Sequence, residues 1–182
     1  MKNALVLHGR NCTPEMFWYP YIRNELEKLG YQTSVPLLPE YRSADREIWV
    51  PFIKRTFDFQ EDSILIGVSS SCAAILEVVE SLNHFVDKVI LVAGFISPLR
   101  EENTHPVLKD DYNWDKIRRN IRELYIINSD TDEIGADQNK GREIFQKLGG
   151  TQIIMHDQGH FGSIKLDQPY KTFPLLKKLI QY

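Results

Sequence analysis

Short apolar runs alternate along this chain with longer segments of mixed polarity. The runs are rich in valine, isoleucine and leucine and lack clean apolar–polar alternation, which is the pattern of parallel strands covered on both faces. The segments between them carry apolar residues at helical spacing. The predicted strands are Ala4–Leu7, Gln32–Val35, Ser63–Ile66, Lys88–Val92, Leu124–Ile127 and Gln152–Met155.

Five helices are predicted between and after these strands. The first places Ile22, Leu26 and Leu29 on one face and stops at Gly30, a residue that readily ends a helix. Alternating strands and helices predict an α/β fold with an open sheet of about six parallel strands and helices on both faces. One long irregular stretch, 94–111, is either a cap over a site or a surface loop. The predicted helices are Glu15–Leu29, Arg46–Phe57, Ala73–Leu82, Asp137–Leu148 and Tyr170–Ile180.

Length and composition narrow the class of protein. The 182 residues predict a single domain over 1–182. A net charge of −3 gives no basic footprint for nucleic acid, and no apolar run approaches the roughly 20 residues of a membrane span. The two cysteines, Cys12 and Cys72, have no metal-binding spacing, so we expect a cytoplasmic protein without a metal or other cofactor.

The stretch from Gly67 to Ser71 carries the strongest chemical signal. An apolar strand meets Gly67, three serines follow, and a helical segment begins. Ser69 stands two residues after the glycine, where a nucleophile elbow needs its serine. A serine at such a turn is also a common helix cap. Ser70 and Ser71 compete with Ser69, which is preferred because Gly67 permits the tight approach that an elbow requires.

Further reactive side chains follow later strands. Asp130 and Asp132 come after the fifth strand, and His160 comes after the sixth. Serine, acid and histidine in this order match an α/β-hydrolase triad. Asp132 fits the acid better than Asp130, whose alternative role is in a turn, and Asp157 is the weakest candidate. The predicted catalytic residues are therefore Ser69, Asp132 and His160.

The end of the first strand supplies the predicted oxyanion hole. His8-Gly9-Arg10 follows that strand, and His8 more plausibly shapes the loop than acts as a base. We expect Gly9, Arg10 and the N–H of Ser70 to bind the oxyanion and substrate, with each donor worth about 3 kcal/mol in the transition state.

These motifs resemble the retinoblastoma-binding protein 9 family of small α/β-hydrolase-fold serine hydrolases, over nearly the whole chain. The resemblance implies a compact three-layer sandwich without a large lid domain and hydrolysis of small esters, and it assigns the acid to Asp132. The segments that carry it are His8-Gly9, Phe17–Tyr21, Glu25–Gly30, Pro36–Pro39, Trp49, Gly67–Ser70, Ala93–Phe95, Trp114–Ile117, Ser129–Asp132 and Gly159–Phe161.

The chain departs from the family pattern at three positions. Val68 and Ser71 stand where histidine and glycine are usual, and Glu133 replaces a proline.

The main hypothesis is a serine hydrolase of carboxylic esters that acts on a small ester or acyl substrate. The alternative, motivated by Val68 and Ser71, is a weakly active or inactive hydrolase fold that binds a protein partner. A flavodoxin-like nucleotide binder is less favoured, because no glycine-rich phosphate loop is present.

Overall fold

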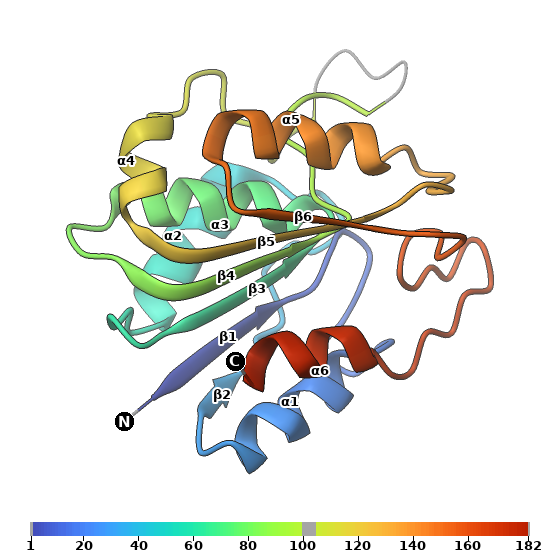
Figure 1. Ribbon diagram of the computed structural model, residues 1–182, viewed down its shortest axis with the longest axis horizontal. Coiled ribbons are helices and arrows are strands. Elements are labelled where there is room, and N and C mark those ends of the chain that lie inside the picture. The colour runs from blue at the N-terminus through green and yellow to red at the C-terminus, as the bar shows by residue number, and fades with distance from the viewer. Residues whose placement is uncertain (1, 100–104, 182) are drawn as a thin grey trace.

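A six-stranded parallel sheet forms the centre of the molecule (Figure 1). The computed structural model describes residues 2–99 and 105–181. The strand order is β2-β1-β3-β4-β5-β6, and every neighbouring pair is parallel. All six predicted strands are confirmed, with ends shifted by up to three residues. The strands are β1 (Asn3–Leu7), β2 (Gln32–Ser34), β3 (Ile64–Val68), β4 (Val86–Val92), β5 (Ile121–Ser129) and β6 (Thr151–Met155).

Helices cover both faces of the sheet, which confirms the predicted three layers. α1 and α6 pack together on one face, and α2 to α5 line the other (Figure 1). This division follows from the topology, because the chain moves from β1 to β2 in one direction and from β3 to β6 in the opposite one. The helices are α1 (Tyr19–Lys28), α2 (Arg46–Thr56), α3 (Ser70–Ser81), α4 (Trp114–Arg119), α5 (Gln138–Leu148) and α6 (Pro174–Gln181).

The first predicted helix was too long at its start. Phe17 has a positive φ of 50°, which a right-handed helix excludes, and Pro20 occupies the first turn, where its missing N–H costs nothing. Ile22 and Leu26 are buried as predicted, but Leu29 is 39% exposed. The helix therefore presents a narrower apolar face than the sequence pattern indicated.

The last and the third predicted helices also differ at their starts. The last begins at Pro174 instead of Tyr170, whose φ is 33°. The third begins at Ser70, directly after the turn at Ser69. One short helix, α4, was missed in the sequence. Its six residues span too few turns for a periodic signal, and its start is fixed by Asn113, whose side chain accepts from the N–H of Lys116 (3.0 Å).

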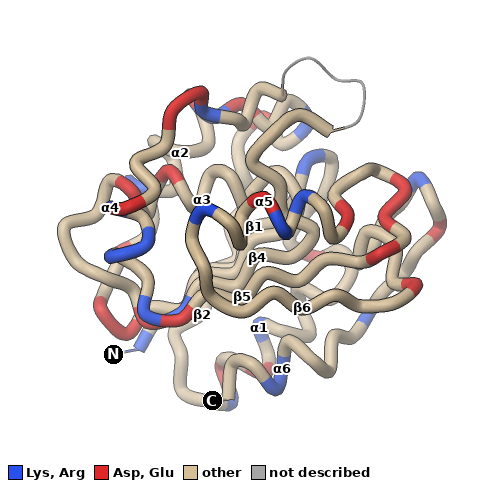
Figure 2. Tube along the Cα trace, turned by 45° about the horizontal axis from the view of Figure 1, so that its top comes forward, with Lys and Arg blue, Asp and Glu red and all other residues tan. Residues whose placement is uncertain are grey.

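Charged residues occur in the loops, in the helices and near the starts of β4 and β5, with both signs interspersed along the chain (Figure 2). The four central strands β1, β3, β4 and β5 are mostly buried, whereas the edge strands β2 and β6 are only partly covered. No helix in the described part of the chain has the length and apolar character needed to cross a bilayer. Of the irregular stretch predicted at 94–111, residues 100–104 lie outside the described residues.

Candidate active site

The candidate site lies where the direction of the chain across the sheet reverses. β1 and β3 are neighbours, but the chain leaves β1 for one side of the sheet and leaves β3 for the other. The carboxyl ends of two such strands border a crevice, which is where open α/β sheets bind ligands. Gly9 and Ser69 follow these two strands, and a Cβ on Gly9 would lie 3.1 Å from the Cβ of Ser69. The two residues are therefore in direct contact across the crevice.

Ser69 forms a sharp turn between β3 and α3. Its backbone angles are φ 57° and ψ −126°, a conformation that costs a residue with a side chain on the order of 1–3 kcal/mol. The Ser69 N–H donates to the carbonyl of Val92 at the end of β4 (2.9 Å). Gly67 lets the helix approach closely, because a Cβ there would lie 2.7 Å from Cδ1 of Ile75. This geometry is that of a nucleophile elbow.

The three consecutive serines have different surroundings. Ser69 is partly exposed, whereas Ser70 and Ser71 are buried. The Ser71 hydroxyl accepts from the N–H of Val68 (2.9 Å) and donates to the carbonyl of Leu7 (2.9 Å) or of Val68 (3.0 Å). Ser71 therefore ties the ends of β1 and β3 to the first turn of α3. Its side chain is accommodated where the usual motif has glycine, and the elbow conformation of Ser69 is retained.

Asp132 and His160 form a buried pair. The Nδ1–H of His160 donates to Oδ2 of Asp132 (2.7 Å), and the Asp132 side chain is fully buried. The other carboxylate oxygen, Oδ1, accepts from the N–H groups of Ile134 (2.9 Å) and Gly135 (3.2 Å). Three donors therefore hold the carboxylate in one orientation. The imidazole is fixed with its Nδ1 proton on the Asp132 side, which leaves Nε2 as the acceptor.

Asp130 makes a second acid–histidine pair at the surface. Its Oδ2 accepts from Nδ1 of His156 (2.6 Å), and its Oδ1 accepts from the N–H of Asp157 (2.9 Å). The hydrogen bond with His156 lowers the pKa of Asp130, and the same bond raises the pKa of His156. The His156 side chain is 87% exposed, in contrast to 9% for His160. Asp130 thus has a partner of its own and is not bonded to His160.

Ser129 joins the loop that carries Asp132 to the loop that carries His160. Its hydroxyl oxygen accepts from the N–H of Thr131 (3.2 Å), in the loop that carries Asp132, and from the N–H of Gln158 (3.0 Å), in the loop that carries His160. A single buried residue at the end of β5 therefore sets the separation of the two loops. Asp157 lies in the second of these loops, and its side-chain contact is with Thr131.

Aromatic packing holds the histidine loop from its other side. The indole Nε1–H of Trp18 donates to the carbonyl of Phe161 (2.9 Å), directly after His160 in the chain. The Phe161 ring stacks on Phe173, with ring centroids 5.4 Å apart and an angle of 14° between the planes. All three aromatic residues are buried. The loop is therefore anchored to the start of α1 and to the segment before α6.

His8 braces the loop that carries Gly9. Its Nε2 accepts from the N–H of Leu38 (3.0 Å), so its proton must be on Nδ1, which donates to the Gly9 carbonyl (2.9 Å). Burial lowers the pKa of His8, which favours the neutral ring that this pattern requires. His8 therefore shapes the loop, as the sequence indicated, and both of its nitrogens are occupied.

The predicted oxyanion donors occupy different positions at this crevice. Gly9 is buried beside Ser69, and Ser70 is the first residue of α3, where N–H groups have no acceptor within the helix. Gly9, through its contact across the crevice, and Ser70, as the next residue in the chain, thus both lie beside the Ser69 turn. Arg10 is exposed in the loop that carries Gly9.

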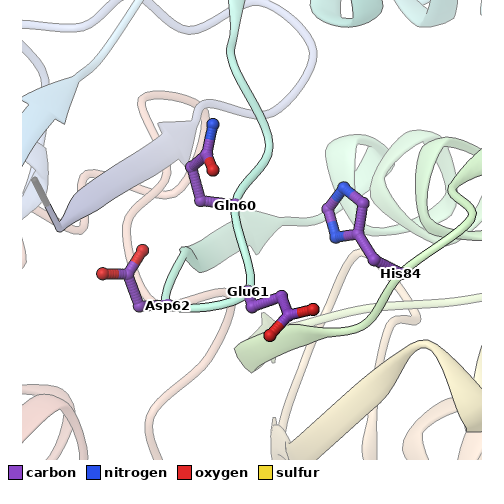
Figure 3. Close-up of a pocket in the computed structure, with 4 residues that line it drawn as sticks. All are labelled: Gln60, Glu61, Asp62 and His84. Carbon is purple, nitrogen blue, oxygen red and sulfur yellow. The ribbon is translucent and has the colours of Figure 1, made fainter.

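A separate hollow of about 570 Å³ lies at the opposite edge of the sheet. Figure 3 shows its lining residues, Gln60, Glu61 and Asp62 before β3 and His84 before β4. Because they precede their strands, they lie at the amino edge, away from Ser69. Nowhere in residues 2–99 or 105–181 do three or more His, Cys, Asp or Glu side chains form a group that could hold a metal ion.

The parallel sheet, the strained serine turn and the acid–histidine pair define the α/β-hydrolase class of folds. Known proteins of this class resemble the chain. It is 29% identical over 147 residues to serine hydrolase RBBP9 of Rattus norvegicus. The matched region covers 79% of this chain and 77% of that protein. The chain is 21% identical over 179 residues to "Putative hydrolase YdeN" of Bacillus subtilis (strain 168); the match covers 96% of this chain and 92% of that protein.

Solved structures show the same fold. The crystal structure of the ydeN gene product from B. subtilis matches with a TM-score of 0.89 at 21% identity, over 100% of this chain and 97% of that one. Est1E from Butyrivibrio proteoclasticus, solved with ferulic acid, matches with a TM-score of 0.72 at 12% identity, over 100% and 87%. No family model matches the chain. The similarities confirm the predicted fold class and the resemblance to small RBBP9-like and YdeN-like hydrolases. They also support the prediction that this protein is a hydrolase.

Three functional contacts escaped the sequence reasoning. The structural bonds of Ser71, the surface pair of Asp130 with His156, and the bridge made by Ser129 all depend on hydroxyl, carboxylate and imidazole groups that are common in loops. Their partners lie up to 64 residues away along the chain. The order of strands in the sheet brings the distant partners together, namely Ser71 with Leu7, Asp130 with His156 and Ser129 with Gln158, so spacing along the sequence carries no signal for these three contacts.

Proposed function

We propose that this protein is a serine hydrolase of carboxylic esters with small acyl groups, and that Ser69, Asp132 and His160 are its catalytic triad. The observation that carries the proposal is the buried 2.7 Å hydrogen bond from His160 to Asp132, at the same sheet edge as the strained turn of Ser69. A histidine held this way keeps Nε2 available for the serine proton. Similarity to serine hydrolase RBBP9 supports serine-based hydrolysis.

The reaction has two halves. Ser69 Oγ attacks the ester carbonyl carbon while His160 Nε2 takes its proton, and the resulting imidazolium is stabilised by the Asp132 carboxylate. The tetrahedral intermediate collapses, the C–O bond to the alcohol breaks, and His160 gives the proton to the departing alcohol. Water then attacks the acyl-enzyme with His160 again as the base, and the acid leaves as Ser69 regains its proton.

Backbone donors at the crevice stabilise the oxyanion. In this proposal the loop of Gly9 and Arg10 and the N–H of Ser70 point at the oxygen that becomes negative, and each donor contributes about 3 kcal/mol to the transition state. The contact between Gly9 and Ser69 supports this arrangement, since both groups then border one reacting carbon. The brace from His8 to the Gly9 carbonyl supports a preorganised loop.

Turnover of short-chain p-nitrophenyl esters tests the proposal. We expect wild-type protein to hydrolyse p-nitrophenyl acetate, and Ser69→Ala to lose about a thousandfold or more in kcat. Ser81→Ala is the matched control, because Ser81 lies exposed at the far end of the same helix. Wild-type turnover no faster than that of Ser69→Ala would contradict the proposal and favour the protein-binding alternative.

A further inference from the structure

A hollow of about 500 Å³ lies beside the candidate active site, in the segment that follows β2. It is lined by residues 37–43. Two hydrogen bonds join this segment to the loop of Gly9: the N–H of Leu38 donates to Nε2 of His8 (3.0 Å), and the N–H of Asn11 donates to the carbonyl of Tyr41 (2.9 Å). The hollow is therefore one loop away from Ser69.

The walls of this hollow are largely apolar. Leu37, Leu38, Pro39 and Tyr41 line it, and Leu37 is 52% exposed. A volume of about 500 Å³ is within the range of sites that bind small molecules, which are mostly apolar with a few polar groups. The polar side chains of Glu40, Arg42 and Ser43 complete the lining. An apolar group of a ligand would therefore contact leucine, proline and aromatic surface.

The walls are also held in place before any ligand binds. The indole Nε1–H of Trp49 donates to the carbonyl of Pro39 (2.9 Å), and the Arg42 guanidinium lies over the Tyr41 ring, 4.9 Å from its centroid. The N–H and hydroxyl of Ser43 both donate to the carbonyl of Glu40 (2.8 and 2.9 Å). A rigid wall loses little conformational entropy on binding, which favours a genuine subsite.

Tyr41 connects the hollow with the loop of Gly9. Its ring meets the His8 ring edge to face, with centroids 6.4 Å apart, and its carbonyl accepts from Asn11. Tyr41 therefore contacts the Gly9 loop directly, through its ring at His8 and through its carbonyl at Asn11. An ester whose carbonyl lies at Ser69 could extend one of its two substituents in this direction.

We propose that the hollow formed by residues 37–43 binds the larger apolar group of the ester substrate, a medium-length aliphatic chain or a single aromatic ring. This inference rests on the proposed ester hydrolysis and adds the substrate class. The apolar group belongs either to the alcohol part, next to the small acyl group proposed above, or to the acyl part, in which case the substrates include esters with medium-length acyl chains. Substrates that carry such a group are hydrolysed with higher kcat/KM than their short-chain counterparts.

Two pairs of esters test the subsite. p-Nitrophenyl octanoate against p-nitrophenyl acetate varies the acyl part, and octyl acetate against methyl acetate varies the alcohol part. We expect Leu37→Asn to lower the long-chain preference, measured as the ratio of kcat/KM values, by about tenfold in one of the pairs. Leu29→Asn is the matched control, since Leu29 is an exposed leucine at the amino-edge end of α1.

The pair that responds identifies the part of the ester in the hollow. A preference that is unchanged in both pairs, or lowered equally by Leu29→Asn, overturns the subsite while leaving Ser69-dependent turnover intact. Binding of octyl acetate and p-nitrophenyl octanoate to Ser69→Ala, followed by saturation-transfer NMR, tests the hollow without catalysis. Addition of Leu37→Asn to Ser69→Ala should weaken binding of one of these two esters about tenfold. If both esters bind the double variant as tightly as they bind Ser69→Ala, the inference is contradicted, even if the proposed hydrolysis fails.

Discussion

Replacement of Asp132 by asparagine should disable the histidine while leaving the fold in place. Oδ1 of Asp132 accepts from the N–H groups of Ile134 and Gly135, so the asparagine oxygen takes that position and its NH2 group faces His160. An NH2 group donates, and therefore Nδ1 of His160 must become the acceptor. The ring proton then moves to Nε2, where it blocks acceptance of a proton from Ser69.

The expected loss follows from this change of tautomer. A triad forced into the wrong tautomer loses about 10⁴-fold in kcat, which corresponds to about 5.4 kcal/mol of transition-state stabilisation. KM should change little, because the carboxylate is fully buried and does not face a substrate. The assay is steady-state hydrolysis of p-nitrophenyl acetate, with urea unfolding to check that Asp132→Asn remains folded.

Asp130→Asn is the matched control for this prediction. It removes the same charge two residues away, from a pair whose histidine is 87% exposed, and exposed pairs contribute little. We expect its kcat to stay within about twofold of wild type. A folded Asp132→Asn protein with nearly wild-type kcat, or an equal loss in Asp130→Asn, would refute the reasoning.

Three further predictions concern the elbow and the surface pair. Gly67→Ala should lower the free energy of unfolding by about 1–3 kcal/mol, measured by urea denaturation, because its Cβ would lie 3.2 Å from the backbone nitrogen of Cys72 and 2.7 Å from Cδ1 of the buried Ile75; unchanged stability would contradict the close approach. Ser71→Ala should also lower the free energy of unfolding by about 1–3 kcal/mol in urea denaturation, because it leaves the buried N–H of Val68 without its acceptor. A variant as stable as wild type would show that this hydrogen bond is dispensable. NMR titration should give His156 a pKa above its ordinary 6.5, and Asp130→Asn should return it toward that value. The stabilisation by this pair should be lost as the pH rises through the raised pKa of His156 and as it falls through the lowered pKa of Asp130; identical titrations in the two proteins would exclude the pairing.

The fold was predictable because its signals are local. Each buried strand is a short apolar run, and stops such as Gly30, with φ 83°, act on their immediate neighbours. The placement of Ser69, Asp132 and His160 beyond the carboxyl ends of β3, β5 and β6 was also readable, since parallel strands bring their carboxyl ends to one edge. Helix starts were less predictable. Positive φ at Phe17 and Tyr170 reflects tertiary packing, which propensity does not report.

The details of the site depended on contacts across the sheet. The sequence raised a doubt about Ser71, but only the structure shows that its hydroxyl bridges β1 and β3. The sequence left the stretch 94–111 as either a cap over a site or a surface loop and gave no sign of the hollow beside the Gly9 loop, which is formed by residues 37–43. Leucine, proline and tyrosine in a loop look the same in a sequence whether they line a hollow or pack in the core.

Covalent labelling by a fluorophosphonate tests the central claim most directly. The reagent should add one phosphonyl group to the wild-type protein, and peptide mass spectrometry should find it on Ser69, the partly exposed serine in the elbow. Ser69→Ala should not be labelled, and Asp132→Asn should be labelled far more slowly than Asp130→Asn. Undiminished labelling of Ser69→Ala, or a phosphonyl group on Ser70 or Ser71, would contradict the assignment of Ser69 as the nucleophile.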